Sequence, residues 1–247
     1  MKPFIKSVSI EDFSHQVWEK KDFMVLLLIP IIFLAGLISQ HFSAGTVWPV
    51  IIDTSVRLIM FIFLIAMYRP MLRKHWNRFA RAWKRSVLVI LGGAVVLQVM
   101  ISAIRSFLPN QGNGAETDAP SLIDPLSASP EMFALLFYIA LGPIVTSLIE
   151  DTIFRYTLLG KIFRGGFFRK ACIVLLNAIL FGLVHYYNFG SVMGTVPYMF
   201  AGLFLNLMYL WTRNIWHVLL IHAVNNTVLT IGGLLIIALM RMLGLTE

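Results

Sequence analysis

The sequence has few charged residues. Only 13% of its 247 residues are charged, whereas 58% are hydrophobic and the mean hydropathy is +0.81. Soluble domains carry about 25% charged residues, so this composition excludes an ordinary soluble globular domain. Apolar stretches recur with short polar breaks along the chain, which indicates one integral membrane domain without a separate soluble module.

Cysteine and acidic residues are also scarce. Cys172 is the only cysteine, which excludes an intramolecular disulfide and a cysteine-rich metal site, so we interpret it as a packing residue. The 12 acidic residues are outnumbered by 20 Lys and Arg, and the net charge is +8. The basic residues lie beside apolar segments, where membrane topology places them, and we therefore expect no nucleic-acid partner.

Long apolar runs set the fold class. A helix needs about 20 residues to cross a bilayer, and the sequence predicts an all-α, polytopic transmembrane bundle of 7 to 8 spans. The last apolar run is long enough for one tilted span or for two pieces broken at Gly232 and Gly233, and both alternatives stay open. The expected spans are residues 23–40, 47–68, 87–105, 132–158, 171–189, 192–211 and 214–240.

The basic residues predict the orientation. If the N-terminus is cytosolic, all Lys and Arg residues except Arg57, Arg105 and Arg241 fall on the cytosolic side. The loop 106–130 contains no Lys or Arg and is expected to be extracytoplasmic, whereas the basic run 69–85 is expected on the anionic inner leaflet. The sequence thus predicts a multi-pass protein of the cell membrane.

The chain divides into two expected regions. Residues 1–22 mix aromatic and charged side chains, as an amphipathic segment at the cytosolic interface would, although a disordered tail is the alternative. Residues 23–247 are expected to form the transmembrane domain, with a catalytic core at about 130–230.

Charged side chains inside the predicted spans need a partner or a task, because each costs about 2.5 to 3.5 kcal/mol on insertion scales. Asp53 and Arg57 are four residues apart, and so are Asp151 and Arg155, so each pair can neutralise itself on one helix face. Glu150 points about 100° away from Asp151 around the helix. It is the carboxylate that this spacing leaves unexplained.

Two histidines lie on other predicted spans. His185 follows Phe181 by one helical turn, and His222 precedes Asn226 by one turn. Each histidine alone is more simply a packing residue. At 1.5 Å per residue, however, Glu150 lies about 16 Å from cytosolic Lys161, His185 about 22 Å from Lys170 and His222 about 13 Å from Arg213. In a hydrocarbon core about 30 Å thick, all three fall near the middle.

This set of side chains suits amide hydrolysis without a serine or cysteine nucleophile. Glu150 could deprotonate water and His185 could share or relay the proton, while His222 and Asn226 could donate to the developing oxyanion. Alternatively, Glu150, His185 and His222 could hold Zn²⁺ and leave one position for water. The cofactor is therefore either zinc or none.

Three segments resemble the motifs of the CAAX-protease and bacteriocin-processing (CPBP, or Abi) family. They are GPIVTSLIEDTIFRYTLLG, NAILFGLVHYYN and GLFLNLMYLWTRNIWHVLLIHAVNNT. The family patterns are Glu-Glu-x-x-x-Arg, Phe-x-x-x-His and His-x-x-x-Asn, which here correspond to Glu150 through Arg155, Phe181 to His185, and His222 to Asn226. The likeness covers about residues 130–230.

The resemblance implies an all-helical fold, commonly of eight spans, that cleaves peptides near a membrane. Members include prenyl-protein CAAX endopeptidases and bacterial proteins that process or give immunity to secreted peptides. The chain departs from the patterns at Asp151, where a second Glu is usual, and at Tyr156, where Gly commonly follows the Arg. Asp151 can still pair with Arg155, whereas Tyr156 adds bulk that could narrow substrate choice or mark a member that no longer cleaves.

The leading hypothesis is an intramembrane endopeptidase whose partners are the lipid bilayer and a membrane-associated, prenylated or secreted peptide. Its catalytic residues would be Glu150, His185, His222 and Asn226. Supporting roles would fall to Asp151, Arg155 and Phe181. The alternatives are a catalytically silent membrane scaffold of the same fold and, third, a proton-coupled transporter.

Overall fold

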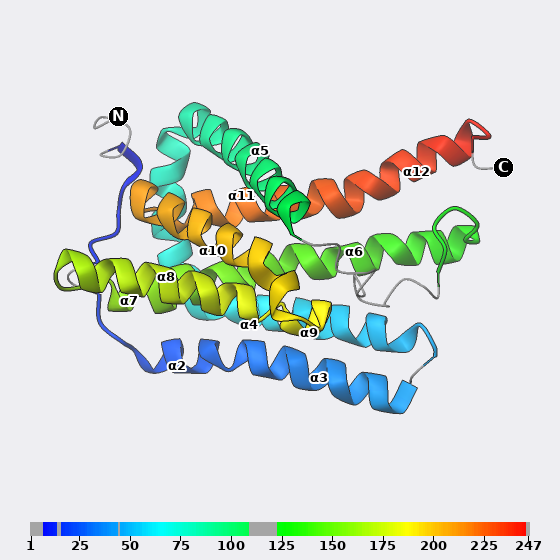
Figure 1. The fold of residues 1–247 in the computed structure, drawn as a ribbon, viewed down its shortest axis with the longest axis horizontal. Helices are drawn as coiled ribbons and strands as arrows, with labels where there is room; N and C mark the ends of the chain where they lie inside the picture. Colours follow the sequence, from blue (N-terminus) through cyan, green and yellow to red (C-terminus); the bar gives the residue numbers. More distant parts are fainter. Residues whose placement is uncertain (1–6, 14–15, 44, 109–122, 246–247) are drawn as a thin grey trace.

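The fold is a bundle of membrane-length helices. The computed structural model describes residues 7–13, 16–43, 45–108 and 123–245, and these contain helices and no strands. Six helical segments in this part of the chain are long and apolar enough to cross a membrane. Together with the shorter α8, they correspond to the seven predicted segments. The predicted all-α membrane bundle is thus confirmed (Figure 1).

The helices follow one another with short connections, apart from the one that includes residues 109–122. In chain order they are α2 (Lys20–Leu26), α3 (Leu28–Ser43), α4 (Trp48–Arg81), α5 (Trp83–Phe107), α6 (Pro130–Asp151), the π-helical η1 (Thr152–Leu159), α7 (Gly160–Ile162), α8 (Phe167–Leu183), α9 (Tyr186–Phe189), α10 (Val192–Thr212), α11 (Ile215–Thr227), the π-helical η2 (Val228–Gly232) and α12 (Gly233–Met242).

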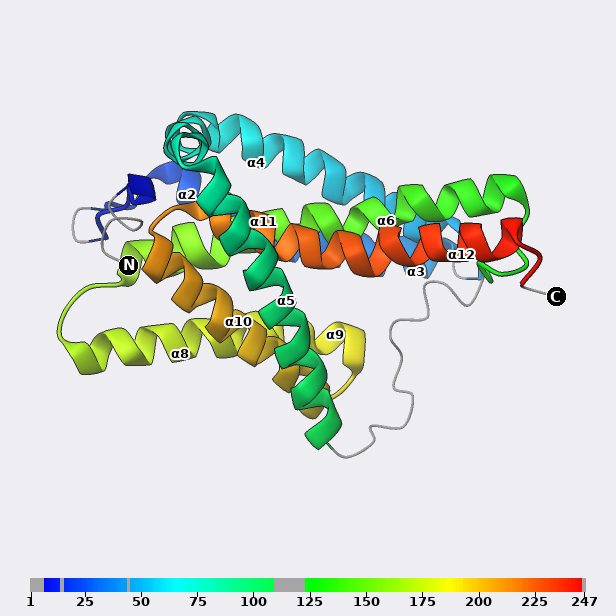
Figure 2. The ribbon, with the colours of Figure 1, turned by 90° about the horizontal axis from the view of Figure 1, so that it is seen from above.

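Helix α4 is longer than predicted. Its predicted span ends at residue 68, but the helix continues through the basic run to Arg81 and contains Pro70. Figures 1 and 2 show that α4 changes direction and that its C-terminal part runs across one end of the bundle. A proline inside a helix removes one backbone hydrogen bond and kinks the chain. Most of the basic run 69–85 is therefore a helical continuation of the predicted span.

Two other helices have boundaries that differ from the prediction, and a third decides between two open alternatives. The helix expected over 132–158 runs without a break from Pro130 to Ile162 through α6, η1 and α7. The last apolar run is a single helical segment, Ile215–Met242, in which η2 ends at Gly232, so the two-piece alternative is wrong. The helix expected over 171–189 ends at Leu183, and a turn precedes α9.

Helix α6 lies at the centre of the bundle, where it packs against α4 and α11 (Figures 1 and 2). Helices α8 and α10 pack closely against each other on one side of it. Gly182 permits this approach, because a Cβ atom there would lie 2.7 Å from the backbone nitrogen of Met199. The three motif segments are thereby brought onto neighbouring helices.

A polar cluster at the end of the bundle near α2 joins the N-terminal region to the core. Lys161 donates to Asp22 at 2.8 Å, and the Tyr68 hydroxyl donates to the other Asp22 oxygen at 2.6 Å. Lys161 also donates to the Val17 carbonyl at 2.6 Å. The Lys161 side chain is only 3% exposed, so it is a buried ion-pair partner, a contact that the sequence did not predict.

Candidate active site

The helix that carries the first motif changes its geometry at the motif. Helix α6 ends at Asp151, and the next eight residues, Thr152–Leu159, form the π-helical segment η1. The Thr152 hydroxyl donates to the Leu148 carbonyl at 2.8 Å, across this transition. Single π-helical turns inside α-helices occur frequently at functional sites. Here the transition immediately follows the two adjacent carboxylates, Glu150 and Asp151.

Asp151 and Arg155 form the predicted ion pair. A nitrogen of the Arg155 guanidinium lies 3.0 Å from the Asp151 carboxylate, and neither side chain is exposed. The contact is close, but the N–H direction is not that of a hydrogen bond, so the attraction is mainly Coulombic. Another Arg155 nitrogen donates to the Gly202 carbonyl of α10 at 3.3 Å. Arg155 therefore links the first motif to a helix outside the three short motifs.

His222 contacts the same carboxylate. Its Nδ1 atom lies 3.3 Å from the second oxygen of Asp151, and only 9% of the residue is exposed. An ionised carboxylate can only accept, so Nδ1 must carry the proton in this contact. That tautomer leaves Nε2 as the ring nitrogen available to a ligand.

The Phe181 ring packs against one polar side chain from each of the three motifs. Its ring centroid is 4.0 Å from the central carbon of the Arg155 guanidinium, which is cation–π geometry. The same ring lies edge-on to His222 at 5.9 Å between centroids and tilted to His185 at 5.3 Å. Phe181 is 1% exposed. It therefore packs against both imidazoles and the guanidinium.

His185 is held by its backbone neighbour and by an aromatic ring of α10. Its Nδ1 atom lies 3.0 Å from the Phe181 carbonyl oxygen, which can only accept, so Nδ1 carries a proton and Nε2 is the free acceptor. The imidazole stacks on Tyr198, with 4.4 Å between ring centroids. Arg105 of α5 in turn donates to the Tyr198 hydroxyl at 2.8 Å. Sequence reasoning missed Tyr198, because no short motif contains it.

Glu150 differs from its neighbour Asp151. It is half-buried, and within the described ranges it has no hydrogen-bond or ion-pair partner. The charges of Glu150 and Arg155 nevertheless act on the His185 imidazole, so these groups lie within electrostatic reach of one another. Glu150 is thus the carboxylate whose oxygens are not already engaged.

Asn226 is engaged elsewhere on α6. Its side-chain amide donates to the Pro143 carbonyl at 3.0 Å, whereas His222 contacts Asp151. An amide nitrogen has two N–H groups, so one donor of Asn226 remains for a ligand. In the same way Asn177 of α8, the helix that precedes the turn with His185, donates to the Phe154 carbonyl at 2.9 Å. These amides join α11 and α8 to the α6–η1 segment.

Tyr156 does not lie beside the three motif groups. Its ring packs edge-on against Tyr68 and His75, at 5.4 and 6.3 Å between centroids, and the Lys161 ammonium lies 5.6 Å from it. The bulk that replaces the usual glycine is therefore accommodated in the polar cluster near α2, a placement that the sequence did not predict.

The residues do not form a metal-ligand set in this conformation. Among the residues that the structure describes, no three His, Cys, Asp or Glu side chains converge as a metal would require. Each histidine keeps one ring nitrogen for a ligand, since the other faces Asp151 or a backbone carbonyl. The side chains of Glu150, His185 and His222 do not converge, however, so as they stand they do not fit zinc.

The fold and this cluster define a polytopic α-helical membrane protein with a carboxylate, a guanidinium and two imidazoles gathered inside the bundle. A family model described as type II CAAX prenyl endopeptidase Rce1-like matches residues 132–228. This range contains all three motif segments, and the match confirms the resemblance of residues 132–228 to the CPBP family. Comparisons with curated proteins and with solved structures gave no match.

Proposed function

We propose that the chain is an intramembrane endopeptidase that cleaves a membrane-associated peptide with water activated by Glu150. The observation that carries the proposal is the contrast between two adjacent carboxylates. Asp151 is fully buried between Arg155 and His222, whereas Glu150 is half-buried and unpaired within the described ranges. A general base needs accessible oxygens. The family match at residues 132–228 supports peptide hydrolysis as the reaction.

Each motif residue then has a role that agrees with its contacts. Glu150 takes a proton from water as that water attacks the peptide carbonyl, and the Nε2 atom of His185 relays the proton to the leaving amine. Asp151 holds His222 by Nδ1 and stabilises its protonated form, so that Nε2–H donates to the oxyanion. The remaining N–H of Asn226 donates to the same oxygen. Arg155 and Phe181 hold this arrangement in place.

The test is a comparison of peptides in membranes that contain the wild-type chain or the Glu150→Gln variant. We expect a peptide product that depends on Glu150, and we expect the purified full-length chain to make it from a synthetic precursor. A prenylated peptide with a CAAX terminus is the first substrate to try, since the family description names that class. Identical peptides in both membranes, with no cleavage by the purified chain, would instead favour the catalytically silent scaffold.

A further inference from the structure

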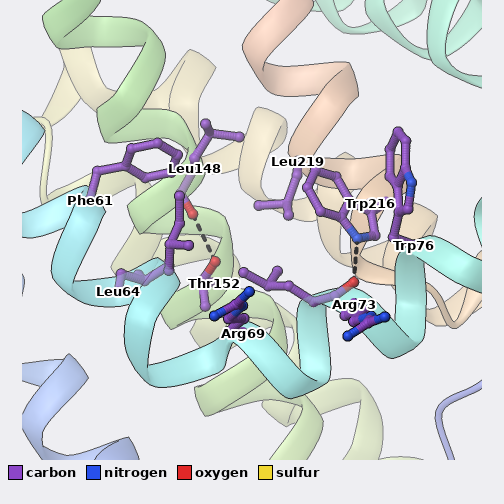
Figure 3. A pocket seen from close by; sticks show the side chains of 11 residues that line it. Phe61, Leu64, Arg69, Arg73, Trp76, Leu148, Thr152, Trp216 and Leu219 are labelled. Carbon is purple, nitrogen blue, oxygen red and sulfur yellow. Dashed lines mark hydrogen bonds between the residues drawn. The ribbon is translucent and has the colours of Figure 1, made fainter.

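A largely apolar cavity lies between α4, the α6–η1 segment and α11. Its volume is about 310 Å³, and nearly all of its wall is hydrocarbon. Figure 3 shows its lining side chains converging from these helices. The apolar lining comprises Phe61, Leu64, Ile65, Leu72, Trp76, Leu148, Trp216 and Leu219, and the other lining residues are Arg69, Arg73 and Thr152.

This cavity is separate from the candidate active site. Leu148 lines it from α6, and Leu148 and Glu150 point about 200° apart around that helix. Two polar groups in its wall are already used, as the dashed lines in Figure 3 show: Thr152 donates to the Leu148 carbonyl, and the Trp216 indole donates to the Leu72 carbonyl at 2.8 Å. The interior therefore offers almost nothing to a polar ligand and suits a hydrocarbon chain.

Two arginines line one edge of this cavity. Arg69 and Arg73 are four residues apart on α4, on one face, and both are exposed. Neither has an ion-pair or hydrogen-bond partner within residues 7–13, 16–43, 45–108 and 123–245. A guanidinium binds phosphate oxygens in a bidentate fork. Two such groups beside an apolar cavity complement a molecule with an anionic head and a hydrocarbon tail.

Two tryptophans place the same edge at a membrane interface. Trp76 and Trp216 lie edge-on, with 4.9 Å between ring centroids, and both line the cavity. Tryptophan is enriched at the level of the lipid headgroups. Basic pockets between transmembrane helices bind anionic lipid headgroups. Aromatic groups, free cations and an apolar interior thus occur together at the bent part of α4.

We propose that this cavity binds an anionic phospholipid. One acyl chain lies among the apolar side chains, and the phosphate lies between Arg69 and Arg73. The sequence predicted that the whole basic run 69–85 lies on anionic lipid. The proposed site is more specific, because it consists of two arginines of that run and one cavity. The proposal does not depend on peptide cleavage, and its test measures lipid binding alone.

The test uses the full-length chain purified in detergent, with bound lipid measured by native mass spectrometry. Dioleoyl phosphatidylglycerol is the anionic probe, and dioleoyl phosphatidylcholine is the zwitterionic comparison. The double variant Arg69→Gln/Arg73→Gln should bind phosphatidylglycerol about tenfold more weakly or worse, since charge-assisted hydrogen bonds are lost. The matched control is Arg81→Gln/Arg85→Gln, which removes two exposed arginines that do not line the cavity.

A second variant tests the acyl chain. Ile65 lines the cavity and is 38% exposed, so Ile65→Trp should fill the space without overpacking the core. We expect it to weaken phosphatidylglycerol binding while the protein keeps its thermal stability. Equal binding of the two lipids, an equal loss in both arginine double variants, or unchanged binding in Ile65→Trp would each overturn the proposal. Displacement of the bound lipid by a lipid-modified peptide would identify the cavity as a substrate site instead.

Discussion

The carboxylate of Asp151 lies within 3.3 Å of the Nδ1 atom of His222 and within 3.0 Å of a guanidinium nitrogen of Arg155. One side chain of the first motif thus contacts a side chain of the third. The sequence spacing predicted only the contact with Arg155. The additional contact means that Asp151 orients an imidazole as well as neutralising a cation, so its loss should affect both stability and rate.

Replacing Asp151 by Ala should lower the stability of the chain by about 3 to 5 kcal/mol, because Arg155 would remain buried without its partner. Thermal unfolding in detergent measures this effect. Asp151→Glu should retain most of the stability, since a carboxylate is kept, and the family pattern has Glu at this place. Asp124→Ala removes an exposed carboxylate and is the control. An unchanged melting temperature in Asp151→Ala would contradict the structural role.

Glu150→Gln should abolish cleavage and leave the folded, membrane-inserted protein at normal abundance. The amide keeps nearly the same size but cannot accept a proton at neutral pH, and Glu150 has no ion pair in the described ranges whose loss would destabilise the fold. The rate of peptide cleavage and the melting temperature are measured side by side. Glu131→Gln, on the exposed first turn of the same helix, serves as the control. If the Glu150→Gln variant still cleaved peptide, Glu150 would not be the general base.

His185→Ala and His222→Ala should each abolish turnover, because the proposed chemistry needs both Nε2 atoms. His41, which is exposed on α3, supplies a neutral control as His41→Ala. Cleavage at the wild-type rate in either His185→Ala or His222→Ala would rule out the proposed chemistry. Loss of activity with chelators, restored by Zn²⁺, would replace it with a metal-dependent one.

Asn226→Ala separates a catalytic amide from a structural one. Loss of an oxyanion donor should lower kcat by about a hundredfold or more, whereas loss of the bond to the Pro143 carbonyl should lower the melting temperature. We expect the rate effect to dominate. A variant that melts earlier but cleaves at the wild-type rate would show that Asn226 only joins α11 to α6.

Local spacing predicted the contacts that lie on a single helix. The ion pairs Asp53–Arg57 and Asp151–Arg155 are both present, because residues four apart on a helix share a face. The lengths of the apolar runs likewise located the membrane-length helices. Both inferences need only the geometry of one helix.

Contacts between helices could not be predicted in this way. Tyr198 stacks on His185, and His222 reaches Asp151, only because of how α6, α8, α10 and α11 pack. Lys161 and Asp22 are far apart in the chain, so no local spacing predicts their buried pair. The kinked continuation of α4 was missed because the apolar run ends at residue 68 and basic residues follow it.

Cysteine labelling tests the predicted orientation. A cysteine at Ser121, which lies outside the described residues, should react with a membrane-impermeant maleimide added from outside, because loop 106–130 is predicted to be extracytoplasmic. A cysteine at Asn77, exposed on the bent part of α4, should not react until the membrane is permeabilised. Both are placed in a Cys172→Ser background, since Cys172 is partly exposed. The reverse labelling pattern would overturn the orientation and the depth argument.

The buried pair of Lys161 and Asp22 should contribute strongly to stability, because either charge would destabilise the folded protein if it stayed buried without its partner. Their atoms are 2.8 Å apart, and the side chains are 3% and 0% exposed. Lys161→Ala should therefore lower the unfolding free energy by about 3 to 5 kcal/mol. Lys84→Ala, at an exposed lysine, should change the unfolding free energy by less than about 0.5 kcal/mol.

The double variant Lys161→Met/Asp22→Asn removes both charges together, so it should be more stable than Lys161→Ala. The single variants Lys161→Met and Asp22→Asn complete the cycle. If the double variant loses the sum of their separate effects, the two residues do not stabilise each other in spite of the short distance between them.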